Sequence, residues 1–532
     1  MMTTEDIAES LELTGKLMEL HNENPFKIKS INSAAYKLSK TRIDLSNQTI
    51  EDLTKIDGIG KSLAEKILEF HTTGTSKELN DLIHQTPKGV IEMLGIKGLG
   101  PKKVRQLWKE LELESVTELL YACNENRLVE LKGFGEKTQN SIIQNIEFKQ
   151  KNAGWYHYAY AEKIGQVIID KLKQHTDLVS FTGAMHRRCE TIEEIDILIG
   201  DEEIDIDEFE SDTIPINFIK VNPHLYYKTL VETSSTIAHL QGINFKDLAI
   251  KKYDSEQSVY QSLNIQYCEP ELREGLFELE KAKQFQLPQL IEYSDLKGIL
   301  HNHTTYSDGM NSLKEMALYC KELGYQYLGI CDHSQTAVYA DGLKPETILL
   351  QHQEIDKLNE ELFPFKIFKG IESDILGNGD LDYEEAILKT FDFVVASVHA
   401  NLKMDEEKAN TRLIKAIENP YTTILGHPTG RLLLGRPGYP INHKKIIDAC
   451  AANKVVIELN AHPYRLDIDW RWIPYCLEKG VMISINPDAH QLNGYHDMRY
   501  GTLVARKGLL TKEACLNTMD LQSFEQFLKH KS

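Results

Sequence analysis

An apolar run that ends in two histidines, Gly298-Ile299-Leu300-His301-Asn302-His303, opens the C-terminal half of the chain. Near the end of the chain a similar run, Met482-Ile483-Ser484-Ile485, leads to Asp488-Ala489-His490. Residues i and i+2 of an extended chain point the same way, so the two polar side chains of each pair are expected to converge. Short apolar segments with paired metal-type ligands therefore frame this half of the sequence.

Five further apolar runs lie between these two, and helical segments separate them. The runs are Tyr327-Leu328-Gly329-Ile330, Lys366-Ile367-Phe368, Phe393-Val394-Val395-Ala396-Ser397-Val398, Thr423-Ile424-Leu425 and Val455-Val456-Ile457-Glu458-Leu459-Asn460. Alternation of short strands with helices is typical of a βα barrel. The C-terminal strand ends of such a barrel meet at one mouth, so side chains at these ends are expected to share one site.

Nearly every run ends at or leads to a histidine or a carboxylate. The set is His301, His303, Asp308, His333, Glu372, His399, His427, Asp488 and His490. Imidazoles mixed with carboxylates suit zinc, manganese or iron better than magnesium or calcium. Nine ligands exceed the needs of one ion, and adjacent metal ions favour phosphoester hydrolysis. A lone histidine at a strand end is usually structural, but its recurrence at successive strand ends favours a site of two to three Mn2+ or Zn2+ ions.

The same residues resemble a known family, the PHP (polymerase and histidinol phosphatase) domain. The matching motifs are His301-Asn302-His303, Asp332-His333, Glu372, His399, Gly426-His427-Pro428 and Asp488-Ala489-His490, and all nine ligand positions of the family are filled. Longer stretches resemble the PHP domain of bacterial X-family DNA polymerases: Leu381-Asp382-Tyr383, Gly426-His427-Pro428-Thr429-Gly430-Arg431 and Arg465-Leu466-Asp467. This resemblance implies a distorted (β/α)7 barrel, three metal ions and manganese-stimulated 3′-to-5′ exonuclease activity.

Two details of this half remain open from the sequence. Pro487 stands where the family usually has Thr, which should alter the backbone rather than the ligation. Arg431 and Arg465 are candidates to bind substrate phosphate. Ion pairs that brace the loops are an equally good interpretation of both arginines.

The N-terminal 150 residues read as helices joined by short turns, and three turns share one form. These turns are Gly58-Ile59-Gly60-Lys61, Gly98-Leu99-Gly100-Pro101-Lys102 and Gly133-Phe134-Gly135-Glu136-Lys137. They resemble helix-hairpin-helix motifs, in which a Gly-x-Gly turn lets backbone N–H groups approach a DNA phosphate without reading sequence. One such turn could be a plain helix C-cap. Three of them with lysines nearby predict DNA binding through Gly58, Gly60, Lys61, Gly98, Gly100, Lys102, Gly133, Gly135 and Lys137.

Residues 10–80 also resemble the small N-terminal domain of X-family polymerases. Some members remove a deoxyribose phosphate through a lysine Schiff base, and the matching residue is Lys66. Imine formation needs an amine whose pKa is depressed. Lys61 or Lys27, as a neighbouring cation, could lower the pKa of Lys66 in this way. The competing interpretation is a solvated helix lysine.

A third segment, Gly183 to Asp196, resembles the nucleotidyltransferase motif of the same polymerases. Glu194 stands in place of the first metal-binding Asp, Asp196 keeps the second, and the third acid falls most plausibly at Asn217. Mg2+ demands near-ideal octahedral geometry, so a longer acid and a neutral amide should both harm its site. We therefore expect a palm that is retained as a scaffold with a degenerate polymerase centre, and Mg2+ only if that centre is active.

Composition limits the remaining possibilities. The 532 residues carry a net charge of −20, which excludes nucleic acid wrapped over the whole surface but not a local contact. The eight cysteines form no CxxC pair, and neither a signal peptide nor a bilayer-length apolar run is evident. The expected location is the cytoplasm, with no membrane contact.

The expected fold class is multidomain, in family order. It comprises an N-terminal helical domain with a helix-hairpin-helix (1–82), a fingers-like helix-hairpin-helix domain (83–152), a small α/β nucleotidyltransferase-like palm (153–245), a helical connector (246–292) and the PHP domain (293–532). The leading hypothesis is a DNA-repair 3′-5′ exonuclease that acts on gapped, recessed or single-stranded 3′ ends. The alternatives are an active gap-filling polymerase with exonuclease, a small-molecule phosphatase of the histidinol-phosphate kind, and a non-enzymatic DNA-binding scaffold.

Overall fold

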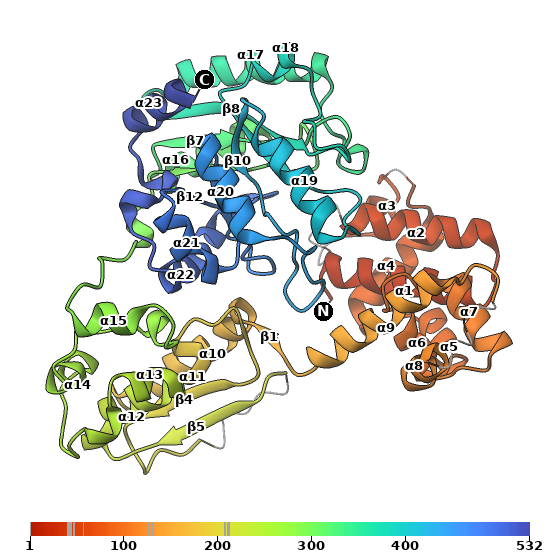
Figure 1. Ribbon diagram of the computed structural model, residues 1–532. Helices are drawn as coiled ribbons and strands as arrows, with labels where there is room; N and C mark the ends of the chain where they lie inside the picture. The colour runs from red at the N-terminus through yellow and green to blue at the C-terminus, as the bar shows by residue number, and fades with distance from the viewer. Residues whose placement is uncertain are drawn as a thin grey trace. The chain divides into compact units, whose positions relative to one another are not determined.

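The computed structural model describes residues 2–39, 45, 48–56, 58–124, 128, 131–206, 209 and 213–531. The chain forms two compact units, Met1–Ala153 and Gly154–Ser532, coloured red to orange and yellow to blue in Figure 1. Within the described ranges every helix is too short or too polar to cross a bilayer.

The first unit is helical throughout its described residues. Its helices are α1 (Thr4–Leu20), α2 (Pro25–Ser39), α3 (Ile50–Leu53), α4 (Lys61–Thr73), α5 (Lys77–His84), α6 (Lys88–Met93), α7 (Pro101–Glu110), α8 (Val116–Asn124) and α9 (Glu136–Lys151). Side chains of Thr3, Thr49 and Ser76 cap the N-termini of α1, α3 and α5 by accepting backbone hydrogen bonds. One continuous apolar core runs from Ile7 to Ile146.

The second unit begins with a small α/β region. Its elements are β1 (Tyr156–His157), α10 (Tyr158–Leu172), β2 (Val179–Phe181), α11 (Gly183–His186), β3 (Thr191–Ile192), β4 (Ile195–Ile199), β5 (Ile216–Lys220) and α12 (Tyr226–Thr233). Strand β4 lies between β2, which is antiparallel to it, and β5, which is parallel; β1 pairs separately with β3. Alternate residues Ile195, Ile197 and Ile199 are buried, which leaves Asp196 on the opposite face.

A helical connector follows the α/β region. It contains α13 (Ile237–Gly242), α14 (Glu256–Ser262) and α15 (Glu278–Lys283), with short 3-10 turns at Phe245–Asp247, Pro270–Leu272 and Tyr293–Asp295; a further 3-10 turn at Pro223–Leu225 precedes α12. Its apolar cluster draws on Val231 of α12 and on Leu509 near the C-terminus, so the connector packs onto its neighbours on both sides.

The rest of the unit is a seven-stranded parallel barrel, in agreement with the predicted fold class. The strands are β6 (Gly298–Ile299), β7 (Tyr327–Ile330), β8 (Lys366–Asp374), β9 (Phe393–Ser397), β10 (Thr422–Leu425), β11 (Val456–Asn460) and β12 (Ile483–Asn486), paired in chain order. A parallel bridge between Asn302 and Ala489, with a 2.9 Å hydrogen bond from His303 N to Ala489 O, nearly closes the ring. Each of the seven expected strands is present.

One strand is longer than the apolar run predicts. The run ends at Phe368, but β8 continues to Asp374, so Glu372 lies inside the strand rather than after it. Gly370 makes this possible because a Cβ there would lie 2.6 Å from both the Phe393 ring and the carbonyl oxygen of Ile330. The strand thus stays tightly paired through a stretch whose apolar pattern is broken.

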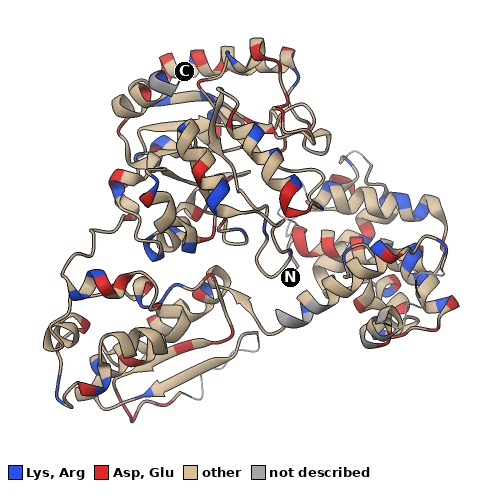
Figure 2. Ribbon diagram, in the orientation of Figure 1, with Lys and Arg blue, Asp and Glu red and all other residues tan. Residues whose placement is uncertain are grey.

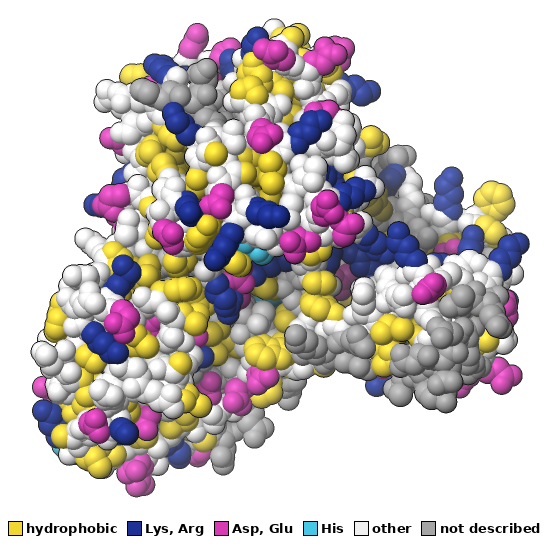
Figure 3. Space-filling model, in the orientation of Figure 1, with side chains coloured by type: hydrophobic (Ala, Val, Ile, Leu, Met, Phe, Trp, Pro, Cys, Tyr) yellow, Lys and Arg dark blue, Asp and Glu magenta, His cyan; other side chains and the backbone are white. Residues whose placement is uncertain are grey.

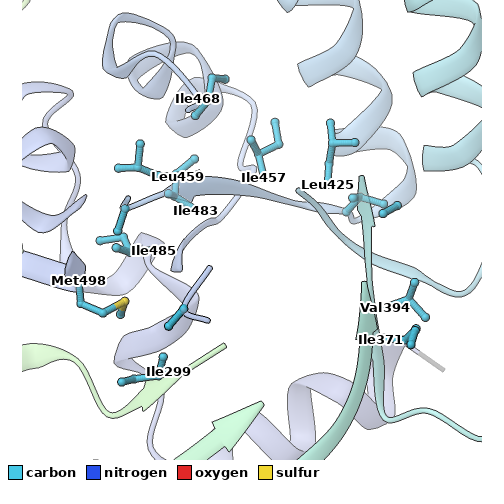
Figure 4. Packing of buried hydrophobic residues seen from close by; sticks show 14 of the residues in the cluster. Ile299, Ile371, Val394, Leu425, Ile457, Leu459, Ile468, Ile483, Ile485 and Met498 are labelled. Atoms are coloured by element: carbon cyan, nitrogen blue, oxygen red, sulfur yellow. The ribbon is translucent and has the colours of Figure 1, made fainter. Parts of the chain in front are cut away.

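Helices cover the outside of the barrel. They are α16 (Leu313–Glu322), α17 (Pro345–Leu362), α18 (Glu385–Leu388), α19 (Glu406–Ile417), α20 (His443–Asn453), α21 (Ile473–Glu478), α22 (Met498–Lys507) and α23 (Leu521–Lys531), with 3-10 turns at Val338–Ala340, Trp470–Trp472, Leu492–Asp497, Lys512–Ala514 and Leu516–Thr518. Outward-facing strand residues such as Ile371, Val394 and Ile457 belong to the large apolar core that Figure 4 shows in part.

The barrel interior changes character from one end to the other. At the N-terminal strand ends a second apolar cluster fills it, where Phe524 of α23 stacks on Tyr327 at a centroid distance of 4.7 Å and lies 4.9 Å from Phe368. Along β11, Val456, Glu458 and Asn460 share the inner face, so polarity increases toward the C-terminal ends. A dry plug closes one end, and buried polar groups collect at the other.

Candidate metal centre and DNA-contacting hairpins

All nine predicted ligand residues gather at the polar end of the barrel. His301 and His303 follow β6, His333 follows β7, Glu372 lies in β8, and His399 and His427 follow β9 and β10; Asp308, Asp488 and His490 come from the first and last loops. Most of these side chains are buried, whereas His490 is 37% exposed at the rim. On the face drawn in Figure 3, histidine surfaces only in small cyan areas.

Glu372 lies at the centre of the group. Its Oε1 lies 3.2 Å from His301 Nε2 and 3.1 Å from the Nε2 atoms of both His399 and His427, and its Oε2 lies 2.9 Å from His333 Nδ1. Burial raises the pKa of this carboxyl, but the surrounding imidazoles outweigh it and hold the pKa well below its usual range. The carboxylate is therefore ionised and faces four nitrogens.

Three sets of donor atoms are close enough together to hold an ion each. They are His303, Asp308, His333 and His490; His301, His303 and Asp488; and His333, Glu372 and His399. His303 and His333 each belong to two sets, so the sets adjoin one another. The mouth of the barrel thus offers adjoining places for metal ions.

The donor chemistry fits cations. The buried Nδ1 atoms of His303 and His427 have no hydrogen-bond partner among the described residues, and an unpaired buried nitrogen costs free energy. Burial and the neighbouring His490 and His333 lower the pKa of His303 to about 3, which keeps it in the neutral form that binds metal. His399 differs: burial lowers its pKa, but Glu372 and Asp374 raise it to about 10.

Carboxylates behind the histidines orient them, and the sequence did not single these acids out. Glu458 is fully buried in β11; its Oε1 lies 2.6 Å from His301 Nδ1, and its Oε2 accepts a 2.6 Å hydrogen bond from the backbone N–H of His427. Asp374 Oδ1 lies 2.5 Å from His399 Nδ1. Such partners fix the ring orientation of a ligating histidine. The sequence does contain a signal for both acids: Glu458 is two residues from Asn460 and Asp374 two residues from Glu372, so each acid shares the inner face of its strand with another polar residue.

The two candidate phosphate-binding arginines have different surroundings. Arg431 donates from Nε to Arg465 O at 2.9 Å, from Nη2 to Leu466 O, and from Nη1 to Asp469 Oδ2 at 2.9 Å, so its guanidinium braces a loop. Arg465 lies with Nε 3.8 Å from Asp488 Oδ2 and is partly exposed. Of the pair, Arg465 is better placed to meet a phosphate at the mouth.

The three Gly-x-Gly turns have one geometry. The middle residues Ile59, Leu99 and Phe134 are each 3% exposed, and their backbone N–H groups donate to Ile56, Ile96 and Leu131 at 3.0 Å. The first glycines, Gly58, Gly98 and Gly133, have φ of 79°, 92° and 89°, a region that disfavours other residues. Each turn therefore anchors its centre in the core and turns both glycines to the surface.

The surface of these turns suits a phosphate. Gly60, Gly100 and Gly135 are exposed, and a Cβ at any of them would meet nothing within 4 Å. No side chain caps the N-termini of α4 and α7 at Gly60 and Gly100, in contrast to α1, α3 and α5. Backbone N–H groups at a helix start attract anions. Lys61, Lys102 and Lys137 are exposed beside them, and Figure 2 shows basic and acidic residues interspersed along these helices.

The candidate palm centre is short of carboxylates. Asn217 of β5 is in register with Asp196 of β4, and its Nδ2 donates to Asp196 Oδ1 at 2.9 Å. Glu194 is exposed just before β4. Burial raises the pKa of Asp196, and the Asn217 hydrogen bond opposes this only in part. Asn217 and Asp196 are thus neighbours, and an amide contacts one of the two acids.

Lys66 shares a carboxylate with a second lysine. Both Lys66 and Lys27 form short ion pairs with Glu78. Burial raises the pKa of Glu78, but hydrogen bonds from the two lysines outweigh it and lower the pKa below its usual value. The Lys66 side chain is thus engaged in an ion pair with Glu78, which competes with Schiff-base formation by this lysine.

Three family models match the helical first unit and the barrel. Family models match residues 2–76 (helix-hairpin-helix domain), 90–147 (SAM-like helix-hairpin-helix tandem) and 300–462 (PHP domain). A probable phosphatase of Thermoanaerobacter is 29% identical over 44% of this chain and 96% of its own length. The solved histidinol phosphate phosphatase of Lactococcus lactis, crystallised with zinc, L-histidinol and phosphate, is 19% identical over 40% of this chain and 94% of its own, with a TM-score of 0.32.

One relative spans the whole chain. The DNA polymerase/3′-5′ exonuclease PolX of Bacillus subtilis is 33% identical to it, over 99% of this chain and 100% of its own length. The match takes in the helical unit, the small α/β region, the connector and the barrel in the same order. The chain therefore belongs to the bacterial X-family DNA polymerases that carry a C-terminal PHP domain.

Proposed function

We infer that the chain is a metal-dependent 3′-to-5′ DNA exonuclease of the X-family polymerase type, which acts through the PHP barrel. The observation that carries this inference is the gathering of nine imidazoles and carboxylates at one barrel mouth, on a chain whose other unit exposes three phosphate-suited hairpins. DNA with gapped, recessed or single-stranded 3′ ends is the proposed substrate, and the cytoplasm is the proposed location. Two to three Mn2+ or Zn2+ ions are the proposed cofactors.

The nine residues would hold these ions, and the ions would supply charge stabilisation and an activated water for hydrolysis of the terminal phosphodiester. Glu458 and Asp374 hold His301 and His399 in position. Arg465 presents its positive charge beside Asp488 and would orient the scissile phosphate. The hairpins would grip the backbone without regard to sequence, so an end of any sequence is a substrate.

Polymerase activity is the alternative within the same family, and the candidate palm centre speaks against it. Two-metal nucleotidyl transfer needs several carboxylates around Mg2+, whereas here an amide is hydrogen-bonded to Asp196 and Glu194 lies exposed. We therefore propose that the palm has lost polymerase activity. The proposed lyase role of Lys66 is weakened in the same way by its ion pair with Glu78.

A small-molecule phosphatase is the alternative from another class. The probable phosphatase of Thermoanaerobacter that resembles this chain matches less than half of it. A metabolite enzyme has no use for three exposed helix-hairpin-helix turns, so the DNA substrate is the better proposal.

The test is digestion of 3′-recessed and single-stranded labelled DNA with Mn2+, with and without the four dNTPs. We expect stepwise shortening from the 3′ end and no extension. His303→Ala should abolish shortening while DNA binding persists, because His303 belongs to two of the three donor sets. The matched control is His496→Ala, an exposed histidine whose Nε2 lies 2.8 Å from the hydroxyl oxygen of Tyr319 on α16. Wild-type digestion by His303→Ala would disprove the site.

A further inference from the structure

An exposed aromatic ring lies on the lip of the barrel mouth. Tyr464 belongs to residues 462–467, which follow β11, and its side chain is 52% exposed. Its neighbour Arg465 is the arginine whose Nε lies 3.8 Å from Asp488. Neither the proposed metal binding nor the proposed phosphate contact involves the exposed ring of Tyr464. We define residues 462–467 as the lip loop.

A ring from the palm stacks on Tyr464. The imidazole of His157 in β1 stacks on Tyr464 at a centroid distance of 4.2 Å and an interplanar angle of 30°. His157 Nε2 also lies 3.0 Å from the carbonyl oxygen of Leu433, whose own N–H donates to Tyr464 O at 2.7 Å. Ring and backbone of Tyr464 are thus both tied to His157, which fixes the orientation of the ring.

Hydrogen bonds next to His157 connect its strand to the barrel. The next residue, Tyr158, is buried, and its hydroxyl donates to Glu162 Oε1 at 2.8 Å. Glu162 accepts two 2.6 Å hydrogen bonds from Arg499 of α22, the helix that follows the Asp488–His490 loop. A bidentate Arg–carboxylate pair of this kind fixes geometry as well as charge. The palm strand is therefore held against the part of the barrel that carries two of the metal-type ligands.

We propose that Tyr464, backed by His157, is a stacking platform for a nucleobase next to the scissile phosphate. This assignment rests on the proposed exonuclease function and adds a subsite of defined chemistry to it: an unpaired base on the ring, with its phosphate beside Arg465. A base in a duplex already stacks on its neighbours, whereas an unpaired base presents a free face. Stacking on an aromatic ring is tolerant of sequence because every base has such a face.

The platform also gives the palm a role that needs no polymerase chemistry. His157 acts as a positioning residue, since it touches Tyr464 and not the substrate. Its ring stacks on the platform and holds it in place. A palm without a complete carboxylate set can therefore still affect which ends are cleaved.

The experiment compares single-stranded oligonucleotides that differ only in one base. One substrate is intact, and two carry an abasic tetrahydrofuran at the last or the penultimate nucleotide. Base stacking on an aromatic side chain is worth about 1–3 kcal/mol, so the full-length wild type with Mn2+ should cleave the intact end with a kcat/KM roughly 5- to 150-fold above the more affected abasic end. Tyr464→Leu should lower kcat/KM on the intact end to the abasic level, and Tyr464→Trp should retain the preference.

The positioning role of His157 has its own readout. His157→Ala should reduce the base preference, and His157→Phe, which keeps a ring behind Tyr464, should restore it. Tyr293→Leu is the matched control, because Tyr293 is an exposed tyrosine that precedes β6 and so lies at the opposite end of the barrel. It should leave the preference unchanged.

Each outcome separates the two hypotheses. If the wild type digests DNA and Tyr464→Leu keeps the full base preference, the platform is wrong and the exonuclease stands. If the wild type shows no base preference, the platform is also wrong. If the wild type digests no DNA end with Mn2+, the proposed function fails and the platform with it.

Discussion

Replacement of Glu458 by glutamine tests whether the buried carboxylates behind the ligands matter for metal binding. The side chain is 0% exposed, and four groups point at it: His301 Nδ1 at 2.6 Å, the N–H of His427 at 2.6 Å, and the amides of Asn486 at 2.9 Å and Asn460 at 3.5 Å. The change preserves shape and removes one charge. Either orientation of the new amide turns an NH2 group toward an N–H donor.

The expected effect follows from these contacts. A carboxylate behind a metal-binding histidine raises the basicity of the ligand and fixes its ring, and loss of such a partner typically costs about 10- to 100-fold in metal affinity or activity. That range corresponds to roughly 1.4–2.7 kcal/mol. An unsatisfied buried donor should also lower folding stability by about 1–3 kcal/mol. Glu458→Gln should therefore bind Mn2+ more weakly and unfold at a lower temperature.

The assay is calorimetric titration of the metal-free protein with Mn2+, followed by DNA digestion across a range of Mn2+ concentrations. Glu361→Gln is the control, because Glu361 is 40% exposed on α17 and pairs only with surface lysines. We expect digestion by Glu458→Gln to recover partly at high Mn2+, since the ligands themselves remain. An unchanged titration and an unchanged rate would refute the orienting role of Glu458.

Three further predictions concern other regions. Gly100→Ala should leave stability unchanged, because its Cβ meets no protein atom, yet weaken DNA binding by several-fold in an anisotropy titration; Gly98→Ala, at φ 92°, should instead cost roughly 1–2 kcal/mol of folding stability. Asn217→Asp should add no nucleotide to a primer with Mg2+ and dNTPs, because Glu194 stays exposed; primer extension would revive the polymerase hypothesis. Burial raises the pKa of Asp497 from 3.8 to about 7, so the folded state keeps a proton that the unfolded chain loses between these values, and stability falls as pH rises through this window. Asp497→Asn should therefore raise Tm at pH 8 and not at pH 4, as thermal melts would show.

The barrel was predictable because its signals are local. Apolar runs such as Thr423-Ile424-Leu425 are short, sit between helical segments and end in ligands, and parallel strands must bring those ends together. Asn217 was identified by resemblance to the polymerase motif, and it lies in register with Asp196 on the adjacent strand. The extension of β8 to Asp374 was missed because it depends on close packing of Phe393 over Gly370.

The roles of residues that depend on partners far away in the chain could not be predicted from the sequence. Glu458 stands among apolar strand residues, and only the folded barrel shows that His301, 157 positions away, needs its carboxylate. The sequence gives no reason to distinguish Arg431 from Arg465. In the structure, however, the guanidinium of Arg431 donates hydrogen bonds to carbonyl oxygens of the lip loop. Likewise, nothing in the sequence around His157 points to Tyr464.

The contacts of the palm bear on why a domain with the proposed degenerate polymerase centre would be kept. If the palm were only a remnant, its interface with the barrel would be expected to contain few ion pairs. Instead, Glu162 and Arg499 form a bidentate pair, and Lys507, which is almost wholly buried, donates to Arg187 O at 2.9 Å and pairs with Glu274 at 2.7 Å. Breaking one partner of a buried charged pair is strongly destabilising. The barrel helix α22 thus depends on the palm and connector for its polar partners, so loss of the palm would harm the nuclease whether or not the palm can polymerise DNA.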